Sequence, residues 1–418
     1  MNDQLKKIEV RHTTKIFGKH SKRAAQLLNE GKTKKEILQM TGATVGVNNA
    51  NFDVLDGEIF VIMGLSGSGK STLVRMLNRL IDPTMGEIRI DGQNIVGMNK
   101  EQLREVRRKK IGMVFQNFAL FPHKTIQENT EYGLEIQGIA KADRATKARE
   151  SLQLVGLAGY EDQFPSQLSG GMQQRVGLAR ALANDPDVLL MDEAFSALDP
   201  LIRKDMQDEL LQLHHDMGKT IIFITHDLDE ALRIGDRIAL MKDGDIVQIG
   251  TPEEILMNPS NQYVERFVED VDLSKVLTAG HIMKKADSVQ LDRGPRVALR
   301  LMERLSISSI YVVDKGNRLL GAVTAQDAVQ ATDTGKSLDD VLVKDVLVTS
   351  RDTILTELFD TVSTASIPVA VVNETNQLEG IIIRGALIGA LAGDGQFINS
   401  ELDTQETEVK EIEVTVHE

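Results

Sequence analysis

The sequence predicts an α/β domain over the first two thirds of the chain, followed by a smaller α+β unit built from an internal repeat. Short apolar runs alternate with segments of helical periodicity, as in domains that bury a parallel sheet. One of these runs, 58–63, leads into a glycine-rich loop and then into a helical segment at 70–80. Farther along, residues 306–321 recur as 365–380, at a constant offset of 59 residues.

The glycine-rich loop, Gly-Leu-Ser-Gly-Ser-Gly-Lys-Ser-Thr at 64–72, has the pattern of a phosphate-binding loop between a strand and a helix. Its glycines let backbone N–H groups surround a polyphosphate, and the helix N-terminus favours the same anion. We expect Lys70 to reach the outer phosphates and Ser71 to contact Mg²⁺, so the predicted ligand is a nucleoside triphosphate. The predicted contacts are Gly64, Ser66, Gly67, Ser68, Gly69, Lys70, Ser71 and Thr72.

The other elements of the first domain follow from periodicity and turn residues. Residues 6–18 alternate as an edge strand would, and 21–41 read as two short helices joined by a turn. Residues 140–180 read as helical with a break near 164–165, and a hairpin is expected at Asp243-Gly244. Further strands are expected at 44–47, 87–92, 111–116, 188–192 and 220–225, and the domain should end near residue 270.

Composition favours a soluble intracellular protein. The 418 residues include no cysteine, no apolar run of membrane-spanning length and no apolar N-terminal leader. A formal charge of −14 argues against nucleic acid as the main partner. The charge is uneven, because residues 15–36 carry seven basic and two acidic side chains, whereas the segment beyond Ser400 carries seven acids and one lysine.

A second anion-binding pattern occurs at 168–175, Leu-Ser-Gly-Gly-Met-Gln-Gln-Arg, where a serine and two glycines open a predicted helix. One nucleotide does not need two phosphate cradles, so two copies of the chain arranged head to tail would bring this segment to the partner's nucleotide. In this segment the chain resembles the ATPase subunit of an ABC transporter, whose signature motif it matches.

The resemblance implies roles for further residues. Glu193 would be the general base, His226 would contact the γ-phosphate, and Gln116 would sense both the γ-phosphate and the metal. Asp192 would hold Mg²⁺ together with Ser71 and Gln116. Phe17 would stack on adenine, although a core role fits it as well, and segment 118–124 would face a membrane partner unless its apolar residues belong to the core. The residues implied to act across the dimer are Ser169, Gly170, Gly171, Gln173 and Asp199.

The repeat resembles a tandem CBS pair, a module that often binds adenine nucleotides. In the first copy Thr324 and Asp327 would meet ribose and phosphate, while the second copy lacks both and offers Arg384. An adenine nucleotide or cyclic dinucleotide at one half, another anionic ligand, and a purely structural pair all remain open. The predicted domains are 1–275 (ATPase, with a basic helical insertion at about 19–44), 279–338 and 339–398 (the CBS pair), and 399–418 (an acidic, disordered tail).

An ABC ATPase with a basic insertion and a CBS pair resembles the ATPase of osmoprotectant importers, which take up glycine betaine, proline betaine or related quaternary amines. The resemblance implies a homodimer on the cytoplasmic face of a bacterial membrane, separate permease subunits and, indirectly, a substrate-binding protein or domain. The alternatives are an amino-acid or metal importer and a soluble ABC ATPase of translation or DNA repair. The basic insertion would contact anionic lipid and respond to ionic strength through Lys22, Arg23, Lys32, Lys34 and Lys35.

Overall fold

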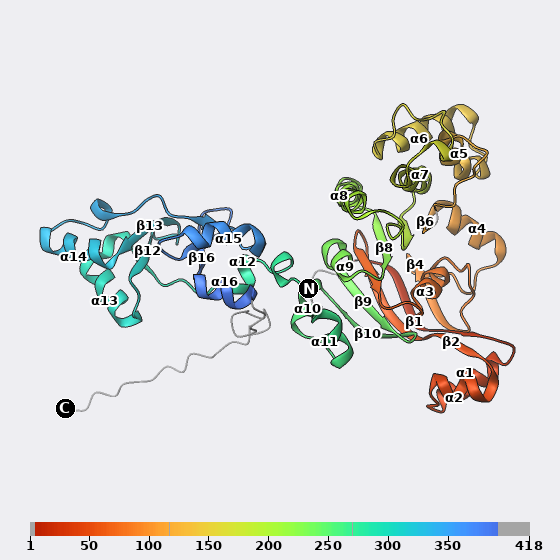
Figure 1. Cartoon of the computed structure of the whole chain (residues 1–418), viewed down its shortest axis with the longest axis horizontal. Helices are drawn as coiled ribbons and strands as arrows, with labels where there is room; N and C mark the ends of the chain where they lie inside the picture. The colour runs from red at the N-terminus through yellow and green to blue at the C-terminus, as the bar shows by residue number, and fades with distance from the viewer. Residues whose placement is uncertain (1–4, 117, 270, 392–418) are drawn as a thin grey trace. The chain divides into compact units, whose positions relative to one another are not determined.

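The structure, a computed structural model, describes residues 5–116, 118–269 and 271–391. It divides between Val271 and Asp272 into two compact units (Figure 1). The predicted tail at 399–418 and the last residues of the second predicted CBS copy lie outside the described residues.

The N-terminal unit is organised around a six-stranded sheet in the order β10-β9-β3-β8-β7-β6. Five strands are parallel, and β10 pairs antiparallel with β9 at one edge. Every residue of β3, β7 and β8 is buried, which confirms the buried strands expected from their continuous apolar runs. The strands are β3 (Ile59–Met63), β6 (Ile111–Phe115), β7 (Val188–Asp192), β8 (Thr220–Thr225), β9 (Arg237–Lys242) and β10 (Asp245–Gly250).

A second sheet, antiparallel and four-stranded, has the order β2-β1-β4-β5. Its strands are β1 (Lys6–Phe17), β2 (Thr44–Leu55), β4 (Met85–Ile90) and β5 (Gln93–Asn94). The expectation that residues 6–18 form an edge strand is wrong, because β1 lies between β2 and β4. Alternating burial shows that one face of a strand is covered, but it carries no information about neighbours supplied by distant parts of the chain.

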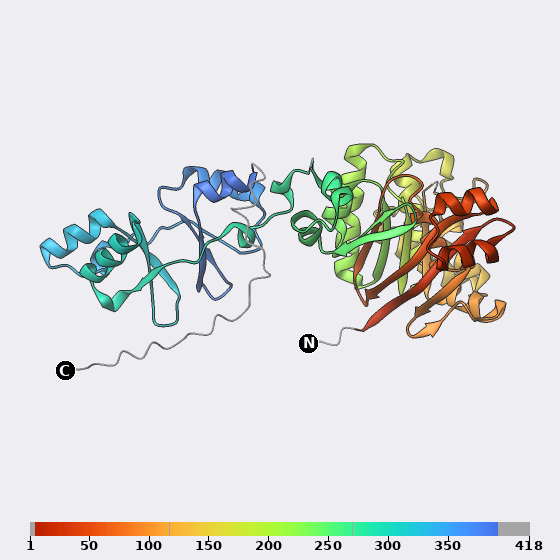
Figure 2. The same ribbon diagram turned by 90° about the horizontal axis from the view of Figure 1, so that it is seen from below.

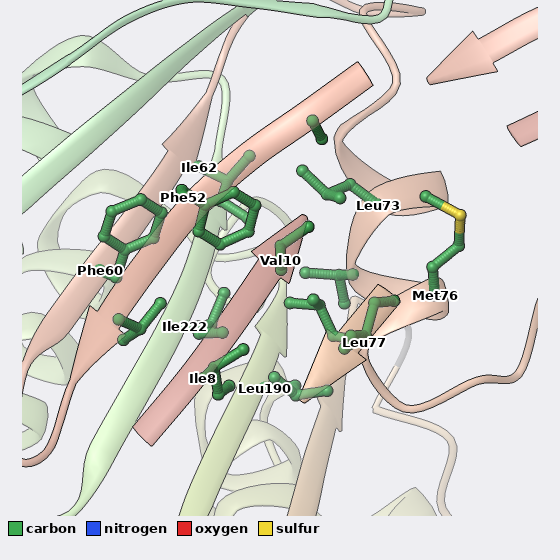
Figure 3. Packing of buried hydrophobic residues seen from close by; sticks show 14 of the residues in the cluster. Ile8, Val10, Phe52, Phe60, Ile62, Leu73, Met76, Leu77, Leu190 and Ile222 are labelled. Carbon is green, nitrogen blue, oxygen red and sulfur yellow. The ribbon is translucent and has the colours of Figure 1, made fainter. Parts of the chain in front are cut away.

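The main core lies between the two sheets and helix α3 (Lys70–Leu77). Figure 3 shows Phe52 of the antiparallel sheet against Phe60 of the parallel sheet, with ring centroids 5.1 Å apart and planes 3° from parallel. Leu73 and Leu77 from α3 complete this layer, and each fully buried side chain of this size contributes about 1.5–3 kcal/mol. The core therefore fixes the helix that begins at Lys70 against both sheets.

Further helices cover the parallel sheet, and α5, α6 and α7 gather away from the insertion (Figure 1). The region expected to be helical at 140–180 is so at 141–154 and from 170 onward, but its break is longer than predicted, because it spans 155–169 and contains a short 3₁₀ turn, Pro165–Gln167. The helices are α4 (Lys100–Lys109), α5 (Ile126–Ile136), α6 (Lys141–Leu154), α7 (Gly170–Leu182), α8 (Pro200–Met217), α9 (Leu228–Ile234), α10 (Pro252–Met257) and α11 (Gln262–Val268).

The two predicted insertion helices are present as α1 (Ser21–Asn29) and α2 (Lys34–Thr41), which lie side by side in Figures 1 and 2. Thr33 and Glu36 form a capping box at the start of α2, and Gly42 ends it with φ 67°. The helices share a small core with the ends of β1 and β2, made of Ile16, Ala24, Leu27, Ile37, Ala43 and Val45. The insertion is therefore a folded element with its own core.

The C-terminal unit repeats one arrangement twice, as the 59-residue offset predicts. Each copy has a helix, a strand, a turn, a second strand and a second helix, and a short additional strand pairs parallel with the first. The first copy comprises β11 (Ser288–Gln290), α13 (Pro295–Leu305), β12 (Ser309–Val313), β13 (Leu319–Thr324) and α14 (Ala325–Thr334). The second comprises β14 (Val348–Thr349), α15 (Leu355–Thr364), β15 (Val369–Val372), β16 (Leu378–Ile382) and α16 (Arg384–Leu391), and α12 (Ala279–Ile282) precedes both.

The two copies exchange equivalent hydrogen bonds through a pair of asparagines. Asn317 and Asn376, which are 59 positions apart, both have φ 61°, a conformation that asparagine tolerates better than most residues. The side-chain amide of Asn317 donates to Leu378 O at 2.8 Å, and that of Asn376 donates to Leu319 O at 3.1 Å. The Leu319 and Leu378 amides donate in turn to Asn376 O and Asn317 O, at 2.9 and 3.0 Å.

Replacing Asn317 by alanine should weaken the joint between the copies. The variant loses one hydrogen bond and places a Cβ-bearing residue without a compensating side chain at positive φ, for an expected loss of about 1–3 kcal/mol. We expect faster amide hydrogen exchange at Leu319 and Leu378. The control Asn317→Gly also loses the hydrogen bond, but glycine adopts positive φ without strain, so the loss of stability should be smaller than in Asn317→Ala. Exchange at wild-type rates in Asn317→Ala would contradict this account.

Candidate functional site

The candidate site lies where four parallel strands end at the same edge of the sheet. Met63 at the end of β3 is paired with Thr225 at the end of β8, and Asp192 at the end of β7 is paired with both Ile224 and Phe115. The segments that follow these strands therefore begin side by side. They carry the glycine-rich loop and three polar residues, Gln116, Glu193 and His226.

The glycine-rich loop depends on close backbone approaches that a side chain would block. A Cβ on Gly64 would lie 2.2 Å from Met241 O, and one on Gly69 would lie 2.4 Å from Gly46 O. Both glycines, like Gly67, have positive φ. The Ser68 hydroxyl is buried without a hydrogen-bond partner in the described structure. A loop of backbone N–H groups with an unpartnered buried hydroxyl fits a phosphate chain, as the sequence predicts.

Lys70 is the buried cation of the site. Its ammonium donates to Gly64 O at 2.7 Å and to Leu65 O at 3.2 Å, and it lies 3.8 Å from the Glu193 carboxylate. Burial lowers the pKa of Lys70, while the charges of Glu193 and Asp192 act in the opposite direction. A bound polyphosphate is an anion, so it would stabilise the charged form of Lys70.

Ser71 and Asp192 supply oxygen ligands of the kind that Mg²⁺ prefers. The Ser71 hydroxyl donates to the Asp192 carboxylate at 3.0 Å, and Asp192 is buried. Mg²⁺ usually takes one or two protein oxygens and completes its shell with water and substrate phosphates, so this donor pair fits the ion. Gln116 was also expected among the ligands, but its amide nitrogen is bonded to Glu193 and Ser196, each at 3.2 Å.

Glu193 stands at the centre of the polar cluster. It accepts from Gln116 at 3.2 Å, and its second neighbour is His226, whose Nδ1 lies 3.4 Å away. Glu193 has φ 48°, and its backbone N–H donates to Ile224 O at 3.1 Å. Glu193, the expected general base, is therefore itself held in the left-handed region, which fits the tendency of backbone strain to concentrate at functional sites.

The signature segment lies on a different element and does not join this cluster. Ser169 caps α7 by accepting from the Met172 amide at 3.3 Å, and Gln173 donates to Leu168 O at 3.1 Å. Gly170 is exposed, whereas a Cβ on Gly171 would lie 2.6 Å from the Ile202 side chain. No contact in the described ranges connects these residues to Lys70 or Ser71. Asp199, which caps α8, is likewise exposed.

Phe17 lies at the end of β1 with 39% of its surface exposed. Its ring packs on Gly46, where a Cβ would lie 2.7 Å from the ring edge, and Gly46 O in turn approaches Gly69 of the phosphate loop. Lys15 lies over the ring at 5.2 Å. An exposed aromatic ring near the loop fits an adenine platform better than the alternative core role.

Sequence reasoning missed the contacts that the β9–β10 turn and helix α11 make with the phosphate loop. The Gly244 amide, in the β9–β10 turn, donates to Ser68 O at 2.8 Å, and Gly244 O accepts from the Asn48 amide at 2.8 Å. The Tyr263 hydroxyl of α11 is buried beside the Leu65 amide without a hydrogen bond of good geometry, and burial raises the pKa of Tyr263. Only the glycine of the hairpin turn marks any of these positions in the sequence.

The segment after Gln116 is partly packed. Phe118 and Leu120 are half-buried and Ala119 is exposed, while Phe121 packs on Tyr132 with ring centroids 4.6 Å apart. Arg180 of α7 donates to the carbonyls of Phe118 and Ala119, both of which have positive φ. These contacts tie the segment to the helix that follows the signature motif.

Three of the five basic side chains expected to act in the insertion already form ion pairs within the chain. Lys34 pairs with Asp245 at 2.5 Å, Lys32 with Glu36 at 3.5 Å, and Arg23 with Glu30 at 3.9 Å. Lys22 and Lys35 are exposed. The surface charge available to a lipid is therefore smaller than the formal charge of the segment.

In the C-terminal unit, Thr324 and Asp327 bond to each other at the start of α14, with the Thr324 hydroxyl 2.6 Å from the Asp327 carboxylate. The Thr324 hydroxyl also caps the helix by accepting from the Asp327 backbone amide at 3.2 Å, so the pair has a structural role whatever else it binds. Arg384 donates to Ser363 O and Ala365 O, and it lines a cavity of about 430 Å³ with residues 365–369.

Comparisons with known proteins bear on both units. Residues 47–196 match the family described as ABC transporter, and residues 279–333 match the CBS domain. A solved dimeric structure of an ATP-binding cassette in a post-hydrolysis state, bound to ADP and phosphate, superposes with a TM-score of 0.50 at 33% identity, covering 59% of this chain and 98% of that one. The predicted fold class is thereby confirmed. No helix in the described part of the chain is long and apolar enough to cross a membrane.

Relatives match along almost the whole chain. The glycine betaine transport ATP-binding protein OpuAA of Bacillus subtilis is 70% identical over 96% of this chain and 96% of its own length. The glycine betaine/carnitine transport ATP-binding protein GbuA of Listeria monocytogenes is 60% identical over 95% of this chain and all of its own length. The glycine betaine/proline betaine transport ATP-binding protein ProV of Escherichia coli is 50% identical over 93% and 98%. The chain therefore belongs to the family of ABC transporter ATP-binding proteins that contains these three transport subunits.

Proposed function

We propose that this chain hydrolyses ATP to power the uptake of glycine betaine or a related quaternary amine through separate permease subunits, on the cytoplasmic face of a bacterial membrane. The observation that carries the proposal is the meeting of Lys70, Ser71, Asp192 and Glu193 at one sheet edge, in a chain whose relatives of like length are glycine betaine transport subunits. An amino-acid or metal importer and a soluble ABC ATPase are the competing functions.

Positioning and charge carry the proposed hydrolysis. The phosphate loop and Lys70 hold the β- and γ-phosphates, so that negative charge developing during transfer meets a buried cation. Glu193 accepts a proton from the attacking water, and His226 and Gln116, which flank Glu193, orient the water and contact the γ-phosphate. Ser71 and Asp192 would hold Mg²⁺, which neutralises phosphate charge when bound.

A homodimer completes the site in this proposal. Ser169 and Gly170 are exposed at the N-terminus of α7, with Gly171 and Gln173 behind them, and no hydrogen bond or ion pair among the described residues joins these four to the phosphate loop of their own chain. A second copy arranged head to tail would place them, with Asp199, against the γ-phosphate. The permease would engage the segment at 118–124, and a substrate-binding protein or domain would act only through the permease.

Regulation would act through the insertion and the C-terminal unit. Exposed lysines of the insertion attract an anionic lipid surface at low salt, and the attraction weakens as ionic strength rises. In the C-terminal unit, an adenine nucleotide or cyclic dinucleotide would contact Thr324 and Asp327, or an anion would contact Arg384. Of these residues, Arg384 lines a cavity able to admit part of such a ligand.

The variant Glu193→Gln should separate nucleotide binding from hydrolysis. Loss of the general base should lower the ATPase kcat by at least about a hundredfold, while ATP still binds and holds two copies together. Phosphate release and size-exclusion chromatography in ATP measure the two effects. The matched control Glu150→Gln changes an exposed glutamate of α6 and should behave as wild type. A Glu193→Gln protein that hydrolyses ATP normally would remove Glu193 from the mechanism.

The cargo and the salt response can be tested together in anionic liposomes that contain this chain and its permease. We expect ATPase activity to rise with glycine betaine and its binding protein outside, and to rise further with internal salt. Neutralising Lys22 and Arg23 together should flatten the salt response, because both are exposed on α1. An unchanged salt response in that variant would remove the lipid contact from the proposal, and no response to betaine would favour the competing importers.

A further inference from the structure

A cavity of about 630 Å³ lies between the basic insertion and the phosphate loop. The insertion contributes Lys32, Lys34 and Lys35 to its wall, and the phosphate loop contributes Gly67. Asn48 of β2 and two aspartates at the β9–β10 turn, Asp243 and Asp245, also line it. The insertion is thus a neighbour of the nucleotide site.

The cavity adjoins both places where parts of a bound nucleotide are expected. Gly67 belongs to the loop that holds the phosphates, and Val45, which also lines the cavity, is next to Gly46, on which the Phe17 ring packs. An ATP molecule with its base on Phe17 and its β- and γ-phosphates in the loop would pass its ribose and α-phosphate between these points. The cavity wall on the insertion side would then face that part of the ligand.

Lys34 fastens the insertion in this position. Its ammonium pairs with the Asp245 carboxylate at 2.5 Å and also donates to the carbonyl of Asp243. The side-chain amide of Asn48 donates to the same Asp245 carboxylate at 2.7 Å, and the Gly244 amide between the two aspartates donates to Ser68 O. Through the β9–β10 turn, the first turn of α2 is therefore connected to the phosphate loop itself.

The two lysines on either side of this ion pair keep charge available to the cavity. Lys32 has only the exposed Glu36 as an ionic partner, at 3.5 Å with both side chains 45% exposed, so the pair is weak. No acidic group in the described ranges lies within ion-pair distance of Lys35. Both cations thus line the same cavity as Gly67 of the phosphate loop.

We propose that the insertion forms the outer wall of the nucleotide site, with Lys32 and Lys35 contacting the ribose and α-phosphate of ATP and Lys34 holding them there. This assignment rests on the proposed ATPase function and adds two binding residues to the same site. The inner face of the insertion, which consists of Lys32, Lys34 and Lys35 at the cavity, would then have a role that is independent of lipid.

The test measures ATP binding to the full chain without lipid. Isothermal titration calorimetry with ATP, in a Glu193→Gln background that prevents hydrolysis, would compare two double variants. Lys32→Gln with Lys35→Gln should raise the Kd for ATP by about tenfold, because charge-assisted contacts to the ligand are lost. Lys22→Gln with Arg23→Gln removes the same charge from the same insertion, away from the cavity, and should change the Kd by less than about twofold. Adenosine keeps the ribose but lacks the phosphates, so the difference in Kd between the two double variants should be smaller for adenosine than for ATP.

Each other outcome overturns the proposal or the function beneath it. An unchanged Kd in both double variants, with binding still abolished by Lys70→Ala, would remove the insertion from the nucleotide site. An equal increase in both would indicate general attraction of charge. Failure of the parent chain to bind ATP would instead overturn the proposed ATPase. Amide exchange of α2, slowed by ATP in the wild-type chain, gives a readout that does not depend on how the variants fold.

Discussion

The N-terminal unit depends on one constraint, which is that four parallel strands have their carboxyl ends aligned at the same edge of the sheet. Met63, Asp192 and Thr225 end β3, β7 and β8 in matched register, and β6 ends beside β7. The strands are buried almost throughout, so sliding one by a residue would draw Asp192 or its neighbour Glu193 into an apolar layer at high cost. Burial thereby enforces the register, and the register places the polar residues within reach of one another.

The β9–β10 turn extends this constraint beyond the sheet. Asp243 has φ 49° and Gly244 has φ 83°, as a two-residue hairpin turn with right-handed strand twist requires. The turn exposes an amide to Ser68 O, a carbonyl to the Asn48 amide and a carboxylate to Lys34. Three segments that are remote in sequence therefore depend on a single tight turn, and a change there would disturb the phosphate loop and the insertion together.

Local patterns explain which features could be predicted from the sequence. The phosphate loop, the buried strands and the insertion helices follow from residue spacing within about twenty positions, and the repeated halves follow from similarity at a constant offset of 59 residues. The antiparallel sheet could not be predicted in this way, because the pairing of β1 with β2 and β4 is not a local pattern. The wrong prediction of an edge strand at 6–18 has the same cause. Gly244 and Tyr263 contact the phosphate loop from positions roughly 180–200 residues away in the sequence. The residues around Leu65 and Ser68 carry no pattern that predicts these contacts. The proposed place of Ser169 against a nucleotide needs a second copy, which one chain does not contain.

The insertion shows why formal charge is a poor guide to the action of a basic segment. Lys34 is a quarter exposed and bound to an aspartate and a carbonyl, whereas Lys22 and Arg23 are exposed, and Arg23 has only the exposed Glu30 as an ionic partner. Salt screens exposed charges strongly and partly buried pairs much less. A rise in ionic strength would therefore loosen any attachment of the outer face to a lipid surface and leave the inner attachment to the β9–β10 turn in place. The two faces of one small element could in this way carry a salt-sensitive contact to lipid and a less salt-sensitive contact to the β9–β10 turn, and the second would keep the insertion next to the phosphate loop when the first is lost.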